Sequence, residues 1–156
     1  MNTSVRPEAV PRPPTAAVDF HRSLPGYRPT PVHGLPALAA ELGLASVDVK
    51  DESRRLGLPA FKVLGASWAI ERTLASRPDV RLLVAASAGN HGHAVARVAR
   101  ERGLRCRVFL PARANEGRRA AIVGEGADVV VVDGSYEDAV AHAARAGTEE
   151  GVATIA

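Results

Sequence analysis

Cysteine is almost absent from this 156-residue sequence, in which Cys106 is the only one. A lone cysteine excludes an internal disulfide framework and a structural zinc site built from several thiolates. Long apolar runs are absent too, because none approaches the roughly 20 residues that a membrane-spanning helix needs. The first 14 residues hold four prolines but no apolar stretch typical of a secretory signal. We therefore expect a cytoplasmic protein without a membrane partner.

Charge of one sign is not concentrated anywhere in the chain. The 20 basic and 17 acidic residues are interspersed and leave a formal net charge of +3. The missing basic block argues against a nucleic-acid partner. The five histidines are scattered, so we expect no metal site. With 46% hydrophobic and 24% charged residues, the composition is that of a globular protein with one domain-sized core.

Lysine is scarce: 18 of the 20 basic residues are arginine, and only Lys50 and Lys62 are lysine. A guanidinium cannot replace an amine nucleophile. A lysine kept in such a chain suits a role that arginine cannot fill, such as bonding to the carbonyl of a cofactor. Composition alone leaves chance as an equal alternative.

The N-terminal part is rich in proline, with eight of the eleven prolines in residues 1–36. Proline restricts the residue before it, so we expect an extended lead-in over residues 1–27. A short helix over 36–42 and a strand over 47–50 follow. From residue 60 the apolar spacing predicts a helix that ends near residue 77 and has Lys62 in its first turn. The apolar residues expected on its core face are Phe61, Leu64, Trp68 and Ile70.

Beyond residue 80 apolar strands alternate with amphipathic helices. We expect strands at 81–86, 105–110, 128–132 and 152–155, and helices at about 91–102, 115–123 and 135–146. Ser135 and Asp138 form a predicted capping box. Continuous apolar runs such as the four valines 129–132 suit strands covered on both faces. The predicted fold class is α/β, a parallel sheet flanked by helices.

A small-residue loop, Ser87-Ala88-Gly89-Asn90-His91-Gly92, separates a predicted strand from the next helix. Ligands of parallel α/β sheets collect at such strand ends, where helix N-termini attract anions. Ser87 and Asn90 can donate hydrogen bonds to a carboxylate or phenolate oxygen. A plain turn that needs glycine explains the loop as well when it is taken alone.

Lys62 is flanked by large apolar residues at a predicted helix start. Partial burial there would favour the neutral, nucleophilic amine. The alternative is a surface lysine that lies over Phe61 and Trp68, and spacing does not decide between the two.

Taken in order, the motifs resemble the fold-type II pyridoxal-phosphate enzymes, the tryptophan-synthase-β-like family. The resemblance runs from about residue 28 to the end. The matching segments are Arg28-Pro29-Thr30-Pro31-Val32, Val49-Lys50-Asp51-Glu52-Ser53, Phe61-Lys62-Val63-Leu64-Gly65, Ser87-Ala88-Gly89-Asn90-His91-Gly92, Val108-Phe109-Leu110-Pro111 and Glu125-Gly126-Ala127-Asp128-Val129. The run from Lys50 to Lys62 is most similar to the diaminopropionate ammonia-lyases, with threonine and serine dehydratases next.

The resemblance implies roles for individual residues. Lys62 is similar to the catalytic lysine that holds pyridoxal 5′-phosphate and moves protons, and Asn90 to the residue that hydrogen-bonds the pyridine 3′-oxygen. The loop that receives the substrate carboxylate corresponds to Ser87, Ala88, Gly89, Asn90, His91 and Gly92. The implied reaction on a small amino acid is α-proton abstraction followed by β-elimination. We expect Lys50, Asp51 and Glu52 to have a structural ion-pair role instead.

One residue departs from the ammonia-lyase pattern. Ala88 stands where those enzymes commonly have an aspartate that serves as a second base, and a dehydratase-like loop fits alanine better. A threonine or serine dehydratase-like lyase is therefore the alternative activity. A nucleotide-binding Rossmann domain is weaker, since no G-x-G-x-x-G follows a strand.

The resemblance also implies a division of the chain. We expect the start of the larger cofactor-binding domain over 28–79, a smaller α/β domain over 80–150 and a return to the larger domain over 151–156. The sequence ends before the family's glycine-rich phosphate loop, so we expect the N-terminal part only of an enzyme that is a homodimer at full length. A truncated, non-catalytic α/β fragment is the alternative from a different class.

Overall fold

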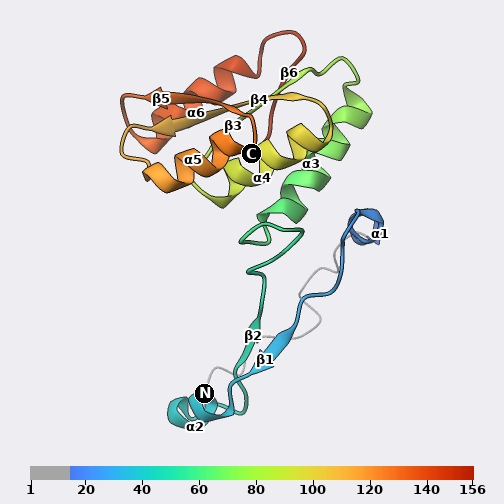
Figure 1. Cartoon of the computed structure of the whole chain (residues 1–156), viewed down its shortest axis with the longest axis vertical. Coiled ribbons are helices and arrows are strands. Elements are labelled where there is room, and N and C mark those ends of the chain that lie inside the picture. Colours follow the sequence, from blue (N-terminus) through green and yellow to red (C-terminus); the bar gives the residue numbers. More distant parts are fainter. Residues whose placement is uncertain (1–14) are drawn as a thin grey trace, which may run out of the picture.

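The computed structural model describes residues 15–156, which form a body of helices around a sheet and an arm that projects from it (Figure 1). Within the described range, none of the helices is long and apolar enough to cross a membrane.

The body is a parallel sheet with helices on both faces, so the predicted α/β class is confirmed (Figure 1). Its strands lie in the order β5-β4-β3-β6, each parallel to its neighbours. Their bounds are Leu82–Ala86 for β3, Arg105–Pro111 for β4, Asp128–Val132 for β5 and Val152–Thr154 for β6. The helices are α3 (Lys62–Ser76), α4 (Asn90–Glu101), α5 (Glu116–Gly124) and α6 (Tyr136–Ala146).

Two separate cores lie on the two faces of the sheet. Side chains of a strand alternate between faces, and in β3 Leu83 and Ala85 join the cluster under α3, α4 and α5. Val84, between them, joins Phe109 in the cluster under α6. All three β3 residues are fully buried, as expected for the central part of a covered parallel strand.

The valine run of β5 was expected to be covered on both faces, and this expectation is wrong. Val132 is buried, but Val131 is 43% exposed. The reason is position: β5 is an edge strand that pairs only with β4, and Val131 lies on the same face as Val129, the side of α3, α4 and α5, where the end of the edge strand is left uncovered.

Side chains or glycine fix several helix ends. The predicted capping box is present at the start of α6, where Ser135 Oγ accepts from the Asp138 amide and Asp138 accepts from the Ser135 amide. Asn115 caps α5 by accepting from the amide of Arg118. These caps fix the starts of α5 and α6, which follow short loops at the carboxyl ends of β4 and β5.

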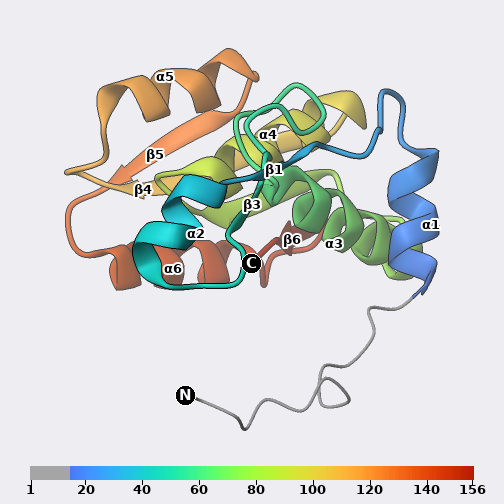
Figure 2. The same ribbon diagram turned by 90° about the horizontal axis from the view of Figure 1, so that it is seen from below.

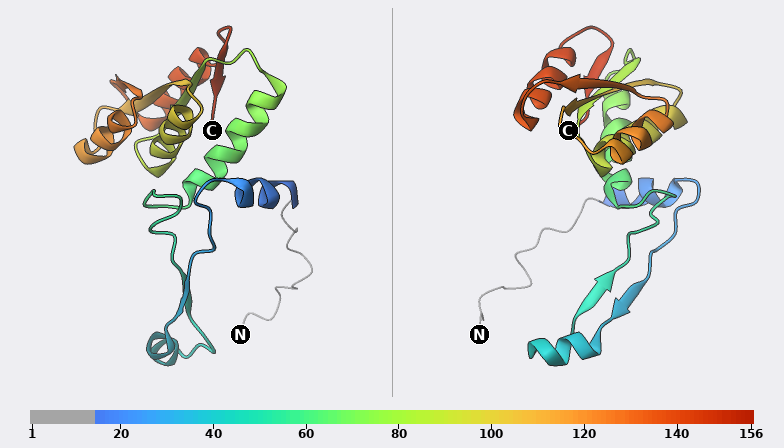
Figure 3. Two further views of the ribbon diagram at one scale, coloured as in Figure 1. Left: turned by 45° about the vertical axis from the view of Figure 1, so that its right-hand side comes forward. Right: turned by 60° about the vertical axis from the view of Figure 1, so that its left-hand side comes forward.

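The arm consists of β1 (Val32–Gly34), α2 (Pro36–Leu42) and β2 (Asp48–Lys50). The two strands pair antiparallel, and α2 lies at the tip, away from the body (Figure 3). Gly43 ends α2 in the left-handed conformation (φ +65°), as its place after the last apolar residue predicts.

The expected extended lead-in over residues 1–27 needs correction. Residues 1–14 lie outside the described residues, and Thr15–Ser23 form a helix, α1, beside α3 (Figure 2). The helix contains no proline, and tertiary contacts stabilise it: Phe20 packs on Trp68 of α3 with ring centroids 5.3 Å apart. His21 Nε2 donates to the carbonyl of Leu64 at 2.8 Å.

Helix α3 begins at Lys62, so the prediction that this lysine lies in a first turn is confirmed. Its buried face holds Ile70, but Phe61, expected in the core, is 54% exposed and Trp68 is only half-buried. Phe61 occupies the position before the helix, where its side chain leaves the core-facing stripe. The buried side chains of α3 are Val63, Ala66, Ser67 and Ile70.

Candidate active site

The two motifs singled out in the sequence meet at one pocket of about 440 Å³. It lies where α3 and α6 begin and where β3 ends. Lys62 contributes from the first turn of α3, and Ser87 and His91 contribute from the loop after β3. Several of the other residues that line the pocket have small side chains or none, namely Gly65, Ala66 and Ala86.

Lys62 is exposed to solvent rather than partly buried, so of the two alternatives left open by the sequence the structure shows the surface lysine. Its Nζ lies 5.3 Å from the centroid of the Phe61 ring. Lys62 therefore lies beside the predicted apolar residue Phe61, and its amine is accessible from the pocket.

The loop after β3 is held close to the sheet and to α4. The Ser87 amide donates to the carbonyl of Phe109, and the Gly89 amide lies 3.3 Å from Ser87 Oγ. A Cβ on Gly92 would lie 2.6 Å from the Ser87 carbonyl oxygen. Glycine at position 92 is thus required for α4 to approach the loop.

His91 and Asn90 face different surroundings. His91 Nε2 lies 3.2 Å from the carbonyl oxygen of Ile155, and because a carbonyl only accepts, Nε2 is the donor in this contact. Asn90 is exposed and lines a second pocket, of about 250 Å³, with His93 and Arg118. The structure therefore brings Lys62, Ser87 and His91 to one pocket but not Asn90.

Tyr136 also lines the Lys62 pocket, and the sequence analysis missed it. It is the first residue of α6, and its hydroxyl donates to the carbonyl of Ala86 at 3.4 Å. A signal was present: Tyr136 follows the turn Asp133-Gly134-Ser135 at the carboxyl end of β5, the same edge of the sheet as the loop after β3.

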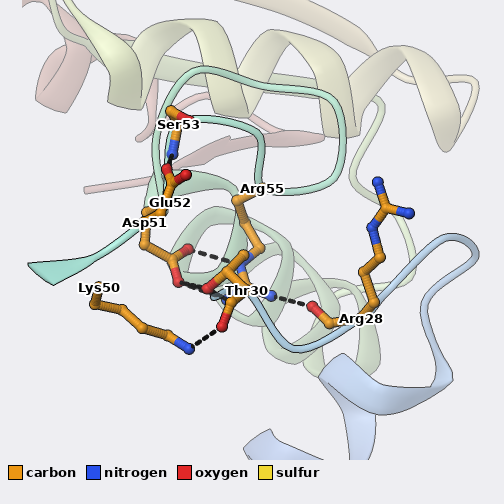
Figure 4. Close-up of polar contacts among 7 residues, drawn as sticks. All are labelled: Arg28, Thr30, Lys50, Asp51, Glu52, Ser53 and Arg55. Atoms are coloured by element: carbon orange, nitrogen blue, oxygen red, sulfur yellow. Dashed lines mark hydrogen bonds and ion pairs between the residues drawn. The ribbon is translucent and has the colours of Figure 1, made fainter. Parts of the chain in front are cut away.

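The predicted structural role of the segment around Glu52 is confirmed for Glu52, and Figure 4 shows the contacts. The Arg55 guanidinium, 5% exposed, donates to both carboxylate oxygens of Glu52, and these bonds lower the pKa of Glu52. Lys50 instead donates to the carbonyl of Thr30 at 2.6 Å. Asp51 accepts from the amide of Ser53. The expected ion-pair role is therefore found for Glu52, which pairs with the buried Arg55, while Asp51 lies 3.8 Å from His33 Nε2 at the surface and Lys50 binds a carbonyl.

A second charged cluster supports α4. Glu125, 6% exposed at the end of α5, accepts hydrogen bonds from Arg97 and His93 of α4 and forms an ion pair with Arg100 of the same helix. The hydrogen bonds from Arg97 are the main cause of a lowered pKa at Glu125. His93 lies in the first turn of α4, so this cluster supports the helix directly behind the loop.

Cys106 is buried in β4, and burial raises the pKa of its thiol to about 12. The thiolate is the reactive form, so this cysteine is chemically inert in the folded chain.

Comparisons with known proteins identify the family of the chain. Residues 23–156 match the family model described as pyridoxal-phosphate dependent enzyme, and the chain therefore belongs to that family. Diaminopropionate ammonia-lyase of Salmonella typhimurium is 37% identical over 153 residues, which cover 85% of this chain and 38% of that protein. A biosynthetic L-threonine dehydratase of Corynebacterium glutamicum is 32% identical over 129 residues and 29% of its length.

The fold matches as well. The crystal structure of apo diaminopropionate ammonia-lyase from Escherichia coli superposes with a TM-score of 0.84 and 33% identity over 91% of this chain and 42% of that one. The chain thus spans less than half the length of these relatives.

Pyridoxal phosphate is the cofactor of this family, and the pocket residues fit its reactive end. An aldehyde needs an accessible amine, and Lys62 presents one at the pocket. A flat ring needs space beside that amine, and an ideal Cβ on Gly65 meets nothing within 4 Å.

Proposed function

We propose that this chain contributes the lysine and the substrate loop of a pyridoxal-phosphate-dependent ammonia-lyase that acts on a small amino acid, such as 2,3-diaminopropionate. The reaction is α-proton abstraction followed by β-elimination of ammonia. One observation carries the proposal: Lys62 and the loop after β3 come from different elements yet line the same pocket. The relatives named as diaminopropionate ammonia-lyase support the substrate class.

In this proposal Lys62 holds the cofactor and then moves the α-proton through the same Nζ. When bound, pyridoxal phosphate supplies the electron sink for the elimination. The amides at the start of α4 and the hydroxyl of Ser87 receive the substrate carboxylate, supported by the positive end of the helix. The sequence assigned Asn90, the first residue of α4, to the pyridine 3′-oxygen, but Asn90 lines a different pocket from Lys62, so the geometry does not support this part of the proposal.

The remaining loop residues have spatial roles in the proposal. Ala88 and Gly89 leave room beside the loop backbone, Gly92 lets α4 approach the loop closely, and His91 lines one side of the pocket. The motifs suggest a division in which residues 28–79 and 151–156 belong to a larger domain and 80–150 to a smaller one, whereas α3 and β6 pack with β3, β4 and β5 in one body of this chain.

A dehydratase-type lyase that releases hydroxide from serine or threonine is the second candidate. Ala88 favours it, because this residue packs against the core cluster and offers no carboxylate to act as a second base. Ammonia and 2-oxo-acid release from both enantiomers of 2,3-diaminopropionate, serine and threonine separates the two reactions. Turnover of diaminopropionate above the other substrates supports the first candidate, and the reverse order supports the second.

The direct test of the site uses the 156-residue chain with pyridoxal phosphate, borohydride reduction and peptide mass mapping. We expect the label on Lys62 and not on Lys50, because Lys50 Nζ is engaged by the Thr30 carbonyl. Labelling of Lys50 alone, or of neither lysine, would overturn the assignment and favour a non-catalytic α/β module.

We further propose that the protein is a cytoplasmic homodimer. Apolar side chains exposed along the arm support self-association. They include Val32, Leu38, Leu42, Leu44 and Val49. Light scattering that gives twice the chain mass of 16.3 kDa is the expected result, and a monomer at all concentrations would contradict it.

A further inference from the structure

We propose that Arg55 is the positioning residue for Lys62: its buried guanidinium holds the turn that leads into α3 and so fixes where the Lys62 amine stands. The inference rests on the proposed function, because it takes Lys62 as the amine that holds the cofactor.

The Arg55 side chain joins two segments of the chain. Its Nε and Nη2 donate to the Glu52 carboxylate at 2.7 and 2.6 Å, and Nη2 also donates to Thr30 Oγ1 at 3.0 Å. Nη1 donates to the carbonyl of Arg28 at 2.7 Å (Figure 4). The guanidinium stands over the Tyr27 ring, 5.4 Å from its centroid. A buried charge with this many partners has one orientation available.

The turn that Arg55 begins is strained. The Leu58 amide donates to the Arg55 carbonyl at 3.0 Å, and the two residues between them, Leu56 (φ +49°) and Gly57 (φ +78°), are left-handed. Leu56 is the only non-glycine residue with positive φ in the described part of the chain. Such a conformation persists where the surroundings over-determine it. Here Arg55 holds one end, and Leu58, 3% exposed, is buried at the other.

The segment between this turn and Lys62 has little conformational freedom. Pro59 restricts the backbone of Leu58, and Leu58 belongs to the same core cluster as Val63. Phe61, at the position before α3, gives the helix no side-chain cap. The start of α3 therefore depends on the preceding turn rather than on a local cap.

The same cluster separates the roles of the two lysines. The Thr30 hydroxyl accepts a hydrogen bond from Arg55 and donates one to Glu52. The Thr30 carbonyl accepts a hydrogen bond from Lys50 Nζ. Lys50 is held by this contact, while Lys62 stays free at the pocket. Loss of Arg55 should affect the two amines in opposite directions, which a general loss of stability would not do.

The test is Arg55→Gln in the 156-residue chain, with Arg54→Gln as the matched control because Arg54 is the exposed neighbour. Subsaturating pyridoxal phosphate, borohydride and peptide mapping give the ratio of Lys62 to Lys50 label. We expect this ratio to fall about tenfold in Arg55→Gln, as for a lost charged hydrogen bond, and to stay unchanged in Arg54→Gln. An unchanged ratio in a folded Arg55→Gln chain would overturn the proposal.

Two further measurements keep the result decisive. If Arg55→Gln does not fold, Thr30→Val removes one partner of the guanidinium and should lower the ratio in the same direction; no change overturns the inference. If the unaltered chain never labels Lys62, the proposed function fails, and hydrogen exchange then tests the positioning alone. Amides of residues 63–66 should exchange faster in Arg55→Gln while those of β3 do not, and equal exchange would contradict the role.

Discussion

Glu125 accepts hydrogen bonds from both Nε and Nη2 of Arg97, each at 2.8 Å. The pair joins the end of α5 to the middle of α4, the helix that begins at the candidate substrate loop. The carboxylate of Glu125 is 6% exposed and Arg97 is partly buried. This pair is therefore a buried ion pair that connects two helices, and breaking it costs more than breaking a surface ion pair.

Glu125→Gln should therefore destabilise the fold by about 2–3 kcal/mol, because it removes the charge that pairs with the guanidinium groups of Arg97 and Arg100. Denaturant unfolding measures the loss. Glu149→Gln, at an exposed glutamate, is the control and should change stability by less than about 0.5 kcal/mol. Equal stability of the two variants would show that the buried cluster contributes nothing net.

Acid should weaken the fold through Glu125 and Glu52. Hydrogen bonds from Arg97 lower the pKa of Glu125, and those from Arg55 lower the pKa of Glu52. Both carboxyls bind protons more weakly in the folded than in the unfolded state. Their stabilisation is therefore complete above the unfolded glutamate pKa of about 4.3 and is lost as pH falls through the lower folded-state values.

The free energy of unfolding, measured by urea titration from pH 7 to pH 3, should decrease on the acid side. The decrease should be shallower in Glu125→Gln, which lacks one of the two groups. A slope identical to that of the unaltered chain would mean that Glu125 is not the titrating group.

Gly92→Ala should disturb the substrate loop, because the new Cβ would lie 2.6 Å from the Ser87 carbonyl oxygen. We expect a loss of about 1–3 kcal/mol and reduced pyridoxal phosphate labelling at Lys62. Gly89→Ala is the matched control, since a Cβ there meets nothing within 4 Å and its φ is −143°. Similar losses in both variants would contradict a specific need for glycine at 92.

Gly65→Ala should separate stability from access to the pocket. Gly65 lies inside α3 with open space at its Cβ position, so alanine should stabilise the helix by about 0.5–1 kcal/mol. The added methyl group reduces the space in the pocket beside Lys62. We therefore expect slower labelling of Lys62 despite the higher melting temperature. Faster labelling, or a lower melting temperature, would contradict this account.

Much of the body followed from local patterns. The strands and helices beyond residue 80, the Ser135 capping box and the place of Lys62 in a first turn depend on periodicity and on contacts within a few residues, which are visible in a sequence. Coverage is different: Val131 is exposed because β5 is an edge strand, and strand order is a long-range property.

The sequence by itself determined the α/β class, the family and the two motifs, because each depends on residue order. Only the tertiary structure decided that Lys62 shares a pocket with Ser87 and Tyr136 while Asn90 lines another. It also decided that residues 15–23 are helical, since Phe20 needs Trp68 as a partner. The role of Arg55 was likewise visible only in the tertiary structure. Its partners Arg28 and Thr30 are distant in sequence, and their hydrogen bonds with the guanidinium matter for stability because the guanidinium is buried.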